Sequence, residues 1–278
     1  MNKLKESELL RSFAGFFLFF LLFVGLLIFI VPSSHQSSKI SDKIRSVKKE
    51  KVTYVAIGDS LTHGVGDRSN QGGYDPVLSQ ALESDFNWQV TPRNYGIAGN
   101  TSNQILKRMQ EKKDIKRDLK KAKLMTLTVG GNDVIHVIKD NITNLNVNTF
   151  SRAAVGYQKR LRQIIELARK ENKTLPIYIT GIYNPFYLNF PEMTEEVSKE
   201  YDNVYFVPVN DLLYKGINGK GGVTSSDETS QSTKSSQDSL NDALFEEDHF
   251  HPNNTGYQIM SDAILKRINQ TKKEWSGE

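Results

Sequence analysis

A serine, an aspartate and a histidine in this 278-residue sequence have the chemistry of a nucleophilic site. Ser60 lies in the segment GDSL at 58–61, directly after an apolar run, and Asp248 precedes His251 by three residues. A serine hydroxyl becomes a strong nucleophile when an imidazole accepts its proton. A carboxylate beside that imidazole fixes the tautomer and stabilises the imidazolium. We therefore predict Ser60 as nucleophile, His251 as base and Asp248 as the carboxylate that orients it.

Acyl transfer also needs hydrogen-bond donors for the negative oxygen that develops on the attacked carbonyl. Glycine at position 99 lets a backbone N–H approach a substrate without a Cβ in the way. The segment GGND at 130–133 adds a side-chain amide at Asn132. The predicted oxyanion donors are the backbone amides of Ser60 and Gly99 and the side chain of Asn132. Each segment alone is also typical of an ordinary strand-to-helix turn. All of them together, in this order, indicate a site.

A metal site is the alternative use of the same histidines. His249 and His251 could bind a metal ion together with Asp248 or His63. No further cluster of histidines or carboxylates supports that alternative, so we predict neither a metal nor a cofactor. We expect His63 at the rim of the nucleophile turn. The sequence contains no cysteine, which excludes disulfides, thiolate metal sites and a cysteine nucleophile.

Two more carboxylates stand beside the predicted site residues, Asp59 next to Ser60 and Asp133 next to Asn132. Aspartate side chains commonly accept hydrogen bonds from nearby backbone amides in turns. We expect both to brace their turns rather than to react.

These residues need a scaffold of strands followed by helices, and the sequence supplies one from residue 52 onward. Five runs rich in β-branched and aromatic residues are typical of strands, the second of them the weakest: 52–58, 88–96, 124–130, 176–182 and 203–209. Between them lie stretches with helical spacing of apolar residues. Alternating strands and helices predict one α/β domain over 52–278 with a mostly parallel sheet. In such a sheet, sites form at the carboxyl ends of the strands.

Two predicted helices have well-defined apolar faces. In residues 151–171 the face consists of Ala154, Tyr157, Leu161, Ile164, Ile165 and Ala168. The last helix is predicted to start near Asn254, with Tyr257, Ile259, Met260, Ile264 and Ile268 as its apolar set.

The N-terminal part is organised differently, as a short segment 1–12, an apolar segment 13–32 and a basic stalk 33–51. Residues 13–31 contain no charge, and a helix of this length spans roughly 28 Å, close to the thickness of a bilayer core. A cleaved signal peptide is the alternative, but its apolar stretch is usually about 7–15 residues. We therefore expect a single-pass membrane anchor, with a secreted protein as the alternative.

The orientation of this anchor rests on the flanking charges. Arg11 lies two residues before the apolar run, whereas residues 32–38 contain no Lys or Arg. The nearest charge thus favours a domain outside the cell, although the larger count of Lys and Arg after the segment favours the cytoplasm.

Charge and low-complexity sequence bound the remaining possibilities. The net charge of +4 comes from the flanks of the apolar segment, since residues 52–278 carry a net −1. We therefore expect no nucleic-acid partner. Residues 216–238 are almost all Gly, Ser, Thr and charged, which predicts a surface loop, with a lid as the alternative. The aromatic stretch 183–187 could form an acyl-pocket wall or ordinary packing.

The sequence resembles the GDSL, or SGNH, family of serine esterases and lipases in four blocks: GDSL at 58–61, the glycine of NYGIAGNTS at 99, GGND at 130–133 and DxxH at 248–251. The resemblance covers residues 52–270 and is greatest to membrane-anchored lipase/acylhydrolase proteins of Gram-positive bacteria. It implies a flavodoxin-like three-layer α/β/α sandwich with a five-stranded parallel sheet. It also implies Ser60, Asp248 and His251 as the triad, and Ser60, Gly99 and Asn132 as the oxyanion hole. The G-x-S-x-G turn of the larger α/β-hydrolases is absent at Ser60.

The function that these observations predict is a membrane-anchored serine esterase that works through an acyl-enzyme. The expected substrates are lipid acyl esters, and O-acetyl groups of cell-wall glycans are the alternative, because the motifs do not distinguish them. A non-catalytic, surface-anchored binding module is the alternative of another class.

Overall fold

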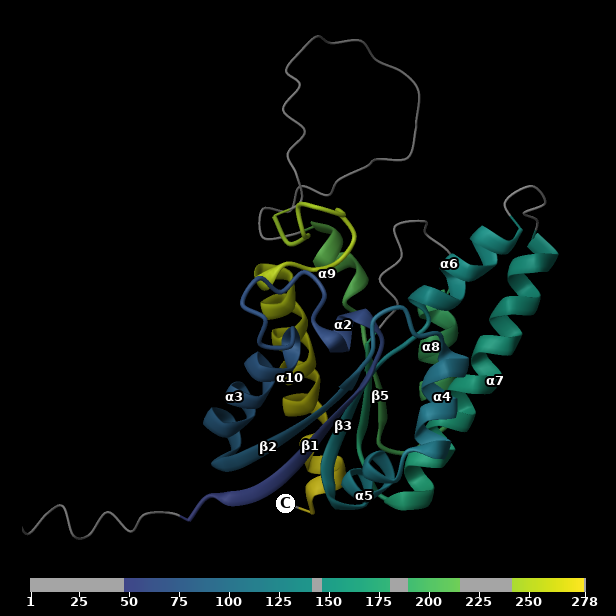
Figure 1. Ribbon diagram of the computed structural model, residues 1–278. Helices are drawn as coiled ribbons and strands as arrows, with labels where there is room; N and C mark the ends of the chain where they lie inside the picture. The colour runs from purple at the N-terminus through teal and green to yellow at the C-terminus, as the bar shows by residue number, and fades with distance from the viewer. Residues whose placement is uncertain (1–47, 142–146, 181–189, 216–241, 278) are drawn as a thin grey trace, which may run out of the picture. The chain divides into compact units, whose positions relative to one another are not determined.

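Five strands form one parallel sheet in the order β2-β1-β3-β4-β5 (Figure 1). The computed structural model describes residues 48–141, 147–180, 190–215 and 242–277. The strands are β1 (Glu50–Gly58), β2 (Trp88–Gly96), β3 (Ala122–Thr128), β4 (Ile177–Thr180) and β5 (Val204–Val207). All five predicted strands are confirmed, including the weakest, at 88–96. β1 begins at Glu50, inside the range predicted as the stalk.

Three predicted segments lie outside the described residues: the membrane segment 13–31, the stretch 183–187 and the loop 216–238. The chain divides into two units, Met1–Lys48 and Lys49–Glu278, and the second contains the whole sheet. No helix within the described ranges has the length and apolar character needed to cross a bilayer.

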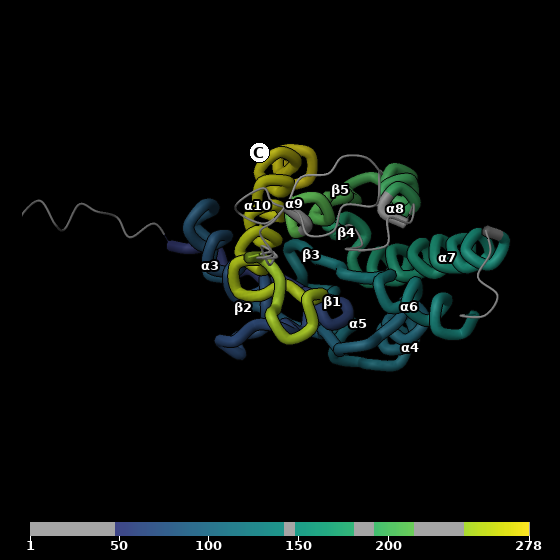
Figure 2. The backbone as a smooth tube through the Cα atoms, turned by 90° about the horizontal axis from the view of Figure 1, so that it is seen from above, coloured from purple at the N-terminus to yellow at the C-terminus, as the bar shows by residue number. Residues whose placement is uncertain are grey.

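Helices cover both faces of the sheet and make three layers (Figures 1 and 2). One face carries α4 (Ser102–Glu111), α5 (Lys113–Lys121), α6 (Gly131–Asp140), α7 (Val147–Glu171) and α8 (Phe190–Ser198). The other face carries α3 (Tyr74–Phe86), α9 (Asn210–Lys215) and α10 (Asn254–Ser276). The short helix α2 (Ser60–His63) follows β1 directly. The predicted α/β/α sandwich is therefore confirmed.

Alternation along β1 explains how one strand supports both layers. Val55 and Ile57 point into the core under α4 and α7, whereas Tyr54 and Ala56 point into the core under α3 and α10. All four are buried, as expected for a strand with helices on both faces. β2 has β1 as its one sheet neighbour and is largely exposed, which explains its weaker strand pattern.

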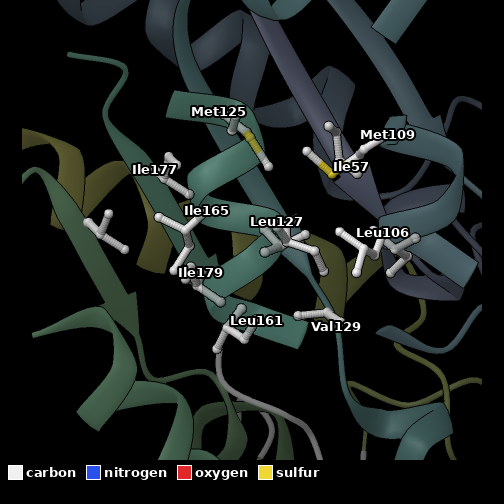
Figure 3. Packing of buried hydrophobic residues seen from close by; sticks show 14 of the residues in the cluster. Ile57, Leu106, Met109, Met125, Leu127, Val129, Leu161, Ile165, Ile177 and Ile179 are labelled. Carbon is white, nitrogen blue, oxygen red and sulfur yellow. The ribbon is translucent and has the colours of Figure 1, made fainter. Parts of the chain in front are cut away.

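The two cores differ in chemistry. The core beneath α4 and α7 is mainly aliphatic (Figure 3), and all six predicted apolar residues of the helix at 151–171 are buried in it. The core beneath α3 and α10 contains five buried tyrosines: Tyr54, Tyr74, Tyr178, Tyr205 and Tyr257. The predicted apolar face of the last helix is also buried there, except that Ile259 is half-buried.

The strand order determines which loops meet. β1 lies between β2 and β3, so the loops after Gly58, Gly96 and Thr128 emerge side by side at one edge of the sheet. These are the loops that carry Ser60, Gly99 and Asn132. The segment 242–253, which carries Asp248 and His251, reaches the same edge because it leads into α10.

Candidate active site

Ser60, His251 and Asp248 form a continuous hydrogen-bonded chain. His251 Nε2 lies 2.9 Å from Ser60 Oγ, and His251 Nδ1 lies 2.6 Å from Asp248 Oδ2. The side chain of His251 is 18% exposed and that of Asp248 is 37% exposed. The structure thus brings together three side chains that the sequence separates by up to 191 residues.

Ser60 is fixed by the turn that begins α2. Asp59 caps this helix, since its Oδ1 accepts hydrogen bonds from the Leu61 amide at 3.1 Å and from Thr128 Oγ1 at 2.8 Å. Burial raises the pKa of Asp59, while the hydrogen bonds from Thr128 and Leu61 act in the opposite direction. The prediction that Asp59 braces its turn is confirmed.

A buried chain of hydroxyl groups lies under this turn. Thr62 Oγ1 is 2.8 Å from Thr128 Oγ1 and 3.1 Å from the Tyr74 hydroxyl. The Tyr74 hydroxyl in turn lies 2.9 Å from Thr126 Oγ1, which is 2.7 Å from the Tyr54 hydroxyl. Sequence reasoning missed this network, because threonine and tyrosine in strands have the same pattern as ordinary strand residues.

Gly58 is required where β1 meets this network. A Cβ at position 58 would lie 2.1 Å from Thr128 Oγ1 and 2.4 Å from Thr62 Oγ1. The glycine before Asp59 therefore allows the nucleophile turn to sit directly on the end of β3.

His251 is held by a turn built around Asp248. Asp248 Oδ1 accepts hydrogen bonds from the amides of Phe250 and His251, both at 2.9 Å. The turn requires a positive φ of 51° at His249. Burial would raise the pKa of Asp248, but the hydrogen bonds from His251 and from these two amides lower it below its ordinary value. The carboxylate is therefore kept in the charged form that can stabilise an imidazolium.

Backbone pairing attaches this turn to the start of α10. The Phe245 amide donates to the His251 carbonyl at 2.7 Å, and the Asn253 amide donates to the Ala243 carbonyl at 3.0 Å. The Asn253 side chain caps α10 by accepting from the Gly256 amide, and it donates to the carbonyls of Asp242 and Leu244.

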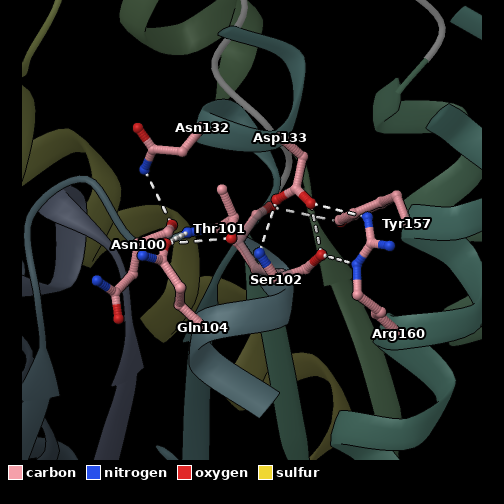
Figure 4. A network of polar contacts seen from close by, with 9 residues as sticks. Asn100, Thr101, Ser102, Gln104, Asn132, Asp133, Tyr157 and Arg160 are labelled. Atoms are coloured by element: carbon pink, nitrogen blue, oxygen red, sulfur yellow. Dashed lines mark hydrogen bonds and ion pairs between the residues drawn. The ribbon is translucent and has the colours of Figure 1, made fainter. Parts of the chain in front are cut away.

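The two predicted donors outside the nucleophile turn are linked to each other. Asn132 Nδ2 donates to the carbonyl of Asn100 at 3.0 Å (Figure 4). Gly99 precedes Asn100 and has a φ of +78°, and a Cβ there would meet nothing within 4 Å. Open space at a left-handed glycine is what a substrate oxygen needs in order to approach a backbone amide.

Arg108 on α4 positions this glycine loop, and sequence reasoning missed it. Its guanidinium donates to the carbonyls of Gly58 at 3.1 Å and Tyr95 at 3.0 Å, and to Asn100 Oδ1 at 2.9 Å. One half-buried side chain thus connects the ends of β1 and β2 to the loop that carries Gly99. Burial lowers its pKa.

Asp133 ties the start of α6 to α4 and α7 (Figure 4). Its carboxylate accepts from the Ser102 amide at 2.8 Å, from Ser102 Oγ at 2.5 Å and from Arg160 on α7 at 3.0 Å. Asp133 is predicted to brace its own turn, but the backbone amide that it binds belongs to Ser102 on α4, and an arginine completes the arrangement. No signal near Arg160 in the sequence identifies this partner.

Two further histidines, His63 and His249, lie at the edge of the site. His63 is exposed, and its Nδ1 lies 3.3 Å from the Gly96 carbonyl, which agrees with its predicted place at the rim. His249 is exposed on the turn between Asp248 and His251. Within the part of the chain that the structure describes, no three potential ligands gather in a way that could hold a metal ion.

This arrangement can perform acyl transfer. His251 can accept the proton of Ser60 while Asp248 stabilises the resulting imidazolium. The loops after β2 and β3, which carry Gly99 and Asn132, leave the sheet at the same edge as the nucleophile turn.

Comparisons with known proteins agree with this chemistry. The model of the GDSL-like lipase/acylhydrolase family matches residues 56–259. The uncharacterized protein YpmR of Bacillus subtilis (strain 168) is 32% identical over 253 residues, which cover 90% of this chain and 92% of that protein.

Two solved structures share the fold. The lipase Lip_vut3 from a goat rumen metagenome has a TM-score of 0.60 at 21% identity, over 77% of this chain and 96% of that one. The acetylxylan esterase Axe2 from Geobacillus stearothermophilus has a TM-score of 0.53 at 18% identity, over 80% and 95% of the two chains.

Proposed function

The chain belongs to the GDSL-like lipase/acylhydrolase family, and we propose that this serine hydrolase of ester bonds works through an acyl-enzyme on Ser60. The hydrogen-bonded chain from Ser60 through His251 to Asp248 is the observation that carries this proposal. In it, nucleophile, base and orienting carboxylate already lie within the reach that proton transfer requires.

The reaction has two halves. Ser60 Oγ bonds to the ester carbonyl carbon while its proton passes to His251 Nε2. The bond from that carbon to the alcohol oxygen then breaks, and the alcohol leaves with the proton from His251. Water attacks the acyl-enzyme, gives a proton to His251 and bonds to the acyl carbon. The carboxylic acid leaves, and the proton on His251 returns to Ser60 Oγ.

The negative oxygen formed in each half is stabilised by the amides of Ser60 and Gly99 and by Asn132 Nδ2. The positive φ and open surroundings of Gly99 support its part in this set. The link from Asn132 to Asn100 supports a fixed relative position of the two outer donors. Fixed donors need no reorganisation as charge develops.

The proposed setting is the outer face of the cell membrane, with residues 13–31 as the anchor. The uncharged apolar sequence of that segment and Arg11 before it support this setting. Lipid acyl esters are the proposed substrates, because an anchored enzyme meets them at high local concentration. O-acetyl esters of cell-wall glycans are the second candidate, because the four sequence blocks do not distinguish the two substrate classes.

The test is hydrolysis of p-nitrophenyl esters from acetate to palmitate by the full chain in detergent. We expect activity that disappears in Ser60→Ala and in His251→Ala while both variants keep the native unfolding transition. A preference for long chains supports lipid substrates, and activity confined to acetate supports glycan O-acetyl esters. Retention of more than a small fraction of activity by either variant contradicts the acyl-enzyme proposal. Absence of hydrolysis at every length favours the binding module.

The orientation has its own test. Protoplasts of Gram-positive cells that carry the full chain are treated with a protease that cannot enter them. We expect the protease to cleave the domain from the cell surface, so that the full-length chain disappears. Full protection of the chain from the protease would place the domain in the cytoplasm.

A further inference from the structure

A cavity of about 640 Å³ lies beside the nucleophile turn, and the reaction described above does not use it. Its walls come from the loop 63–72, from Asp75 at the start of α3, from the end of β2 and from Phe245. The loop leaves directly from the nucleophile turn, since the Gly64 amide donates to the Ser60 carbonyl at 2.9 Å.

Asp75 is the unusual member of this wall. The residue is 5% exposed, yet it lines the cavity. A buried carboxylate is costly unless donors surround it. Ser79 Oγ lies 3.4 Å from its Oδ1, and the Asn94 side chain also hydrogen-bonds to it. The two oxygens of a carboxylate offer about four acceptor positions, so Asp75 has capacity for further donors from a ligand in the cavity.

Asn94 fixes the geometry around Asp75. Its Nδ2 donates to the Thr62 carbonyl at 2.8 Å, and its Oδ1 accepts from the Gly96 amide at 2.8 Å. The amide therefore cannot rotate freely. Carboxylate and amide stand together as a rigid polar pair in the cavity wall.

Asp67 shapes the loop that forms another part of the cavity wall. Its oxygens accept hydrogen bonds from the amides of Ser69, Gln71, Gly72 and Gly73 and from the side chains of Ser69 and Asn254. Burial alone would raise the pKa of Asp67, but these hydrogen bonds lower it to about 2. The loop is thus formed before any ligand binds, which reduces the entropy cost of binding.

The cavity lies next to the segments that carry the nucleophile and the base, because its wall contains His63 and Gly64 of the nucleophile turn and Phe245 of the segment that leads to His251. The Phe245 amide donates to the His251 carbonyl at 2.7 Å, and a Cβ on Gly66 would lie 2.4 Å from the Pro252 carbonyl oxygen. The alcohol oxygen of an ester must lie near His251 to receive its proton, whereas the carbonyl oxygen turns toward the donors. The alcohol of the ester therefore lies on the His251 side of Ser60, next to the segment that contributes Phe245 to the cavity wall.

From this geometry we propose that the cavity binds the alcohol portion of the ester, and that this alcohol carries several hydroxyl groups, as a sugar ring or glycerol does. The inference rests on the proposed esterase function. Hydroxyl groups donate to Asp75 and pair with the side chains of Asn70 and Gln71, while C–H faces of the alcohol pack on Phe245.

Other ligands fit this wall less well. A phosphate would face the carboxylate of Asp75, and the cation nearby, Arg68, is already paired with Glu246 at 2.8 Å. An acyl chain would shield the polar atoms of Asp75, Asn94 and Gln71 that face the cavity from water without offering them a hydrogen bond. Neutral hydroxyl groups can form hydrogen bonds with these polar atoms and carry no negative charge that Asp75 would repel.

The test uses the full chain and pairs of esters that share an acyl group. Glyceryl monobutyrate is compared with butyl butyrate, and an O-acetylated methyl glucoside with cyclohexyl acetate. We expect Asp75→Asn to lower the ratio of kcat/KM for the hydroxylated ester over its partner about 10- to 100-fold, mainly through KM. The glycerol pair and the sugar pair show which alcohol the cavity takes.

Two further variants keep this test decisive. Asp85→Asn, at the exposed end of α3, should leave the ratio unchanged. Gln71→Ala changes an exposed wall residue and should also lower the ratio, although by less than Asp75→Asn does. If Asp75→Asn does not fold, Gln71→Ala provides the test. An equal loss on both members of each pair, or no preference of the native chain for either hydroxylated ester, overturns the proposal.

A binding measurement separates this proposal from the esterase function. Glycerol and methyl glucoside are tested by saturation-transfer NMR against Ser60→Ala with and without Asp75→Asn. Binding that Asp75→Asn removes supports the cavity even if no ester is hydrolysed. Hydrolysis of the simple alkyl esters without such binding contradicts the cavity and leaves the esterase function standing.

Discussion

The two sides of Ser60 are held in place by different means. On the donor side (residues 97–102 and 130–133), charged side chains from helices fix the loops. Arg108 reaches two strand-end carbonyls and Asn100, and Asp133 is bound by Ser102 and Arg160. The base side (residues 64–73 and 242–253) is held by backbone hydrogen bonds, by an asparagine cap and by the carboxylates of Asp67 and Asp248.

Burial separates the two sides further. Asp133 is buried, whereas the side chain of Asp248 is 37% exposed. A charge pair that is largely removed from water is costly to break, because one partner stays desolvated. An exposed partner can be rehydrated instead. Activity and stability should therefore fall together on the donor side and separately on the base side.

The largest effect that we expect is on the base side. Asp248→Asn keeps an oxygen that can accept from the amides of Phe250 and His251. It then turns an uncharged NH₂ donor toward His251 Nδ1, in place of the carboxylate oxygen. We expect kcat to fall about 10⁴-fold, with the free energy of unfolding changed by less than about 1 kcal/mol. Steady-state kinetics and urea unfolding measure the two quantities, and Glu247→Gln on the same turn is the control. Activity near that of the native chain would remove Asp248 from the proposed triad.

On the donor side, Asn132→Ala removes one proposed oxyanion donor. We expect kcat to fall about 10²- to 10³-fold with little change in KM. Asn141→Ala, at the other end of α6, is the matched control. A change in KM alone would indicate that Asn132 binds the substrate and does not stabilise the transition state.

Asp133→Ala tests the coupling of stability to activity directly. It leaves Arg160 and Ser102 without their shared carboxylate, and we expect the free energy of unfolding to fall by about 3 kcal/mol. We also expect a loss of kcat, because Asn132 is the neighbouring residue. Asp140→Ala on the exposed end of α6 should change neither quantity. Lost stability with full activity would show that the donor side does not depend on this charge.

The smallest expected effect is on the free energy of unfolding at acid pH. The pKa of Asp67 is about 2 in the folded chain, below its ordinary 3.8, so folding favours the carboxylate. Its contribution, about 1 kcal/mol after screening by solvent, is complete above about pH 4 and disappears as the pH falls through about 2. Urea unfolding of the native chain and Asp67→Asn should therefore differ at pH 7 and converge at low pH. A difference independent of pH would contradict this role.

Much of the fold could be predicted because its signals are local. β-branched runs mark the buried strands, and the apolar spacing in residues 151–171 predicts the buried face of α7. Parallel strands then bring all their carboxyl ends to one edge, so the blocks at 58–61, 99 and 130–133 had to meet. The turn from Asp248 to His251 is also local, since only three residues separate the two side chains.

Other parts of the site could not be predicted, because their partners are distant in sequence. Arg108 and Arg160 lie on amphipathic helices, where an arginine is expected in solvent, and packing brings each to a carbonyl or carboxylate 8 to 50 residues away. Asp75 is followed by Pro76, a pair typical of the first turn of a helix. Nothing near it indicates a cavity wall.

The sequence by itself determined the elements and the edge of the sheet where the reactive residues gather, because strand and helix periodicity act over neighbouring residues. The tertiary structure alone decided the distances of 2.9 Å and 2.6 Å along Ser60, His251 and Asp248, the charged links of the donor side and the polar cavity beside the base. Each of these depends on how far side chains from separate elements reach once the two helical layers have packed on the sheet. The periodicity of the sequence does not predict such contacts.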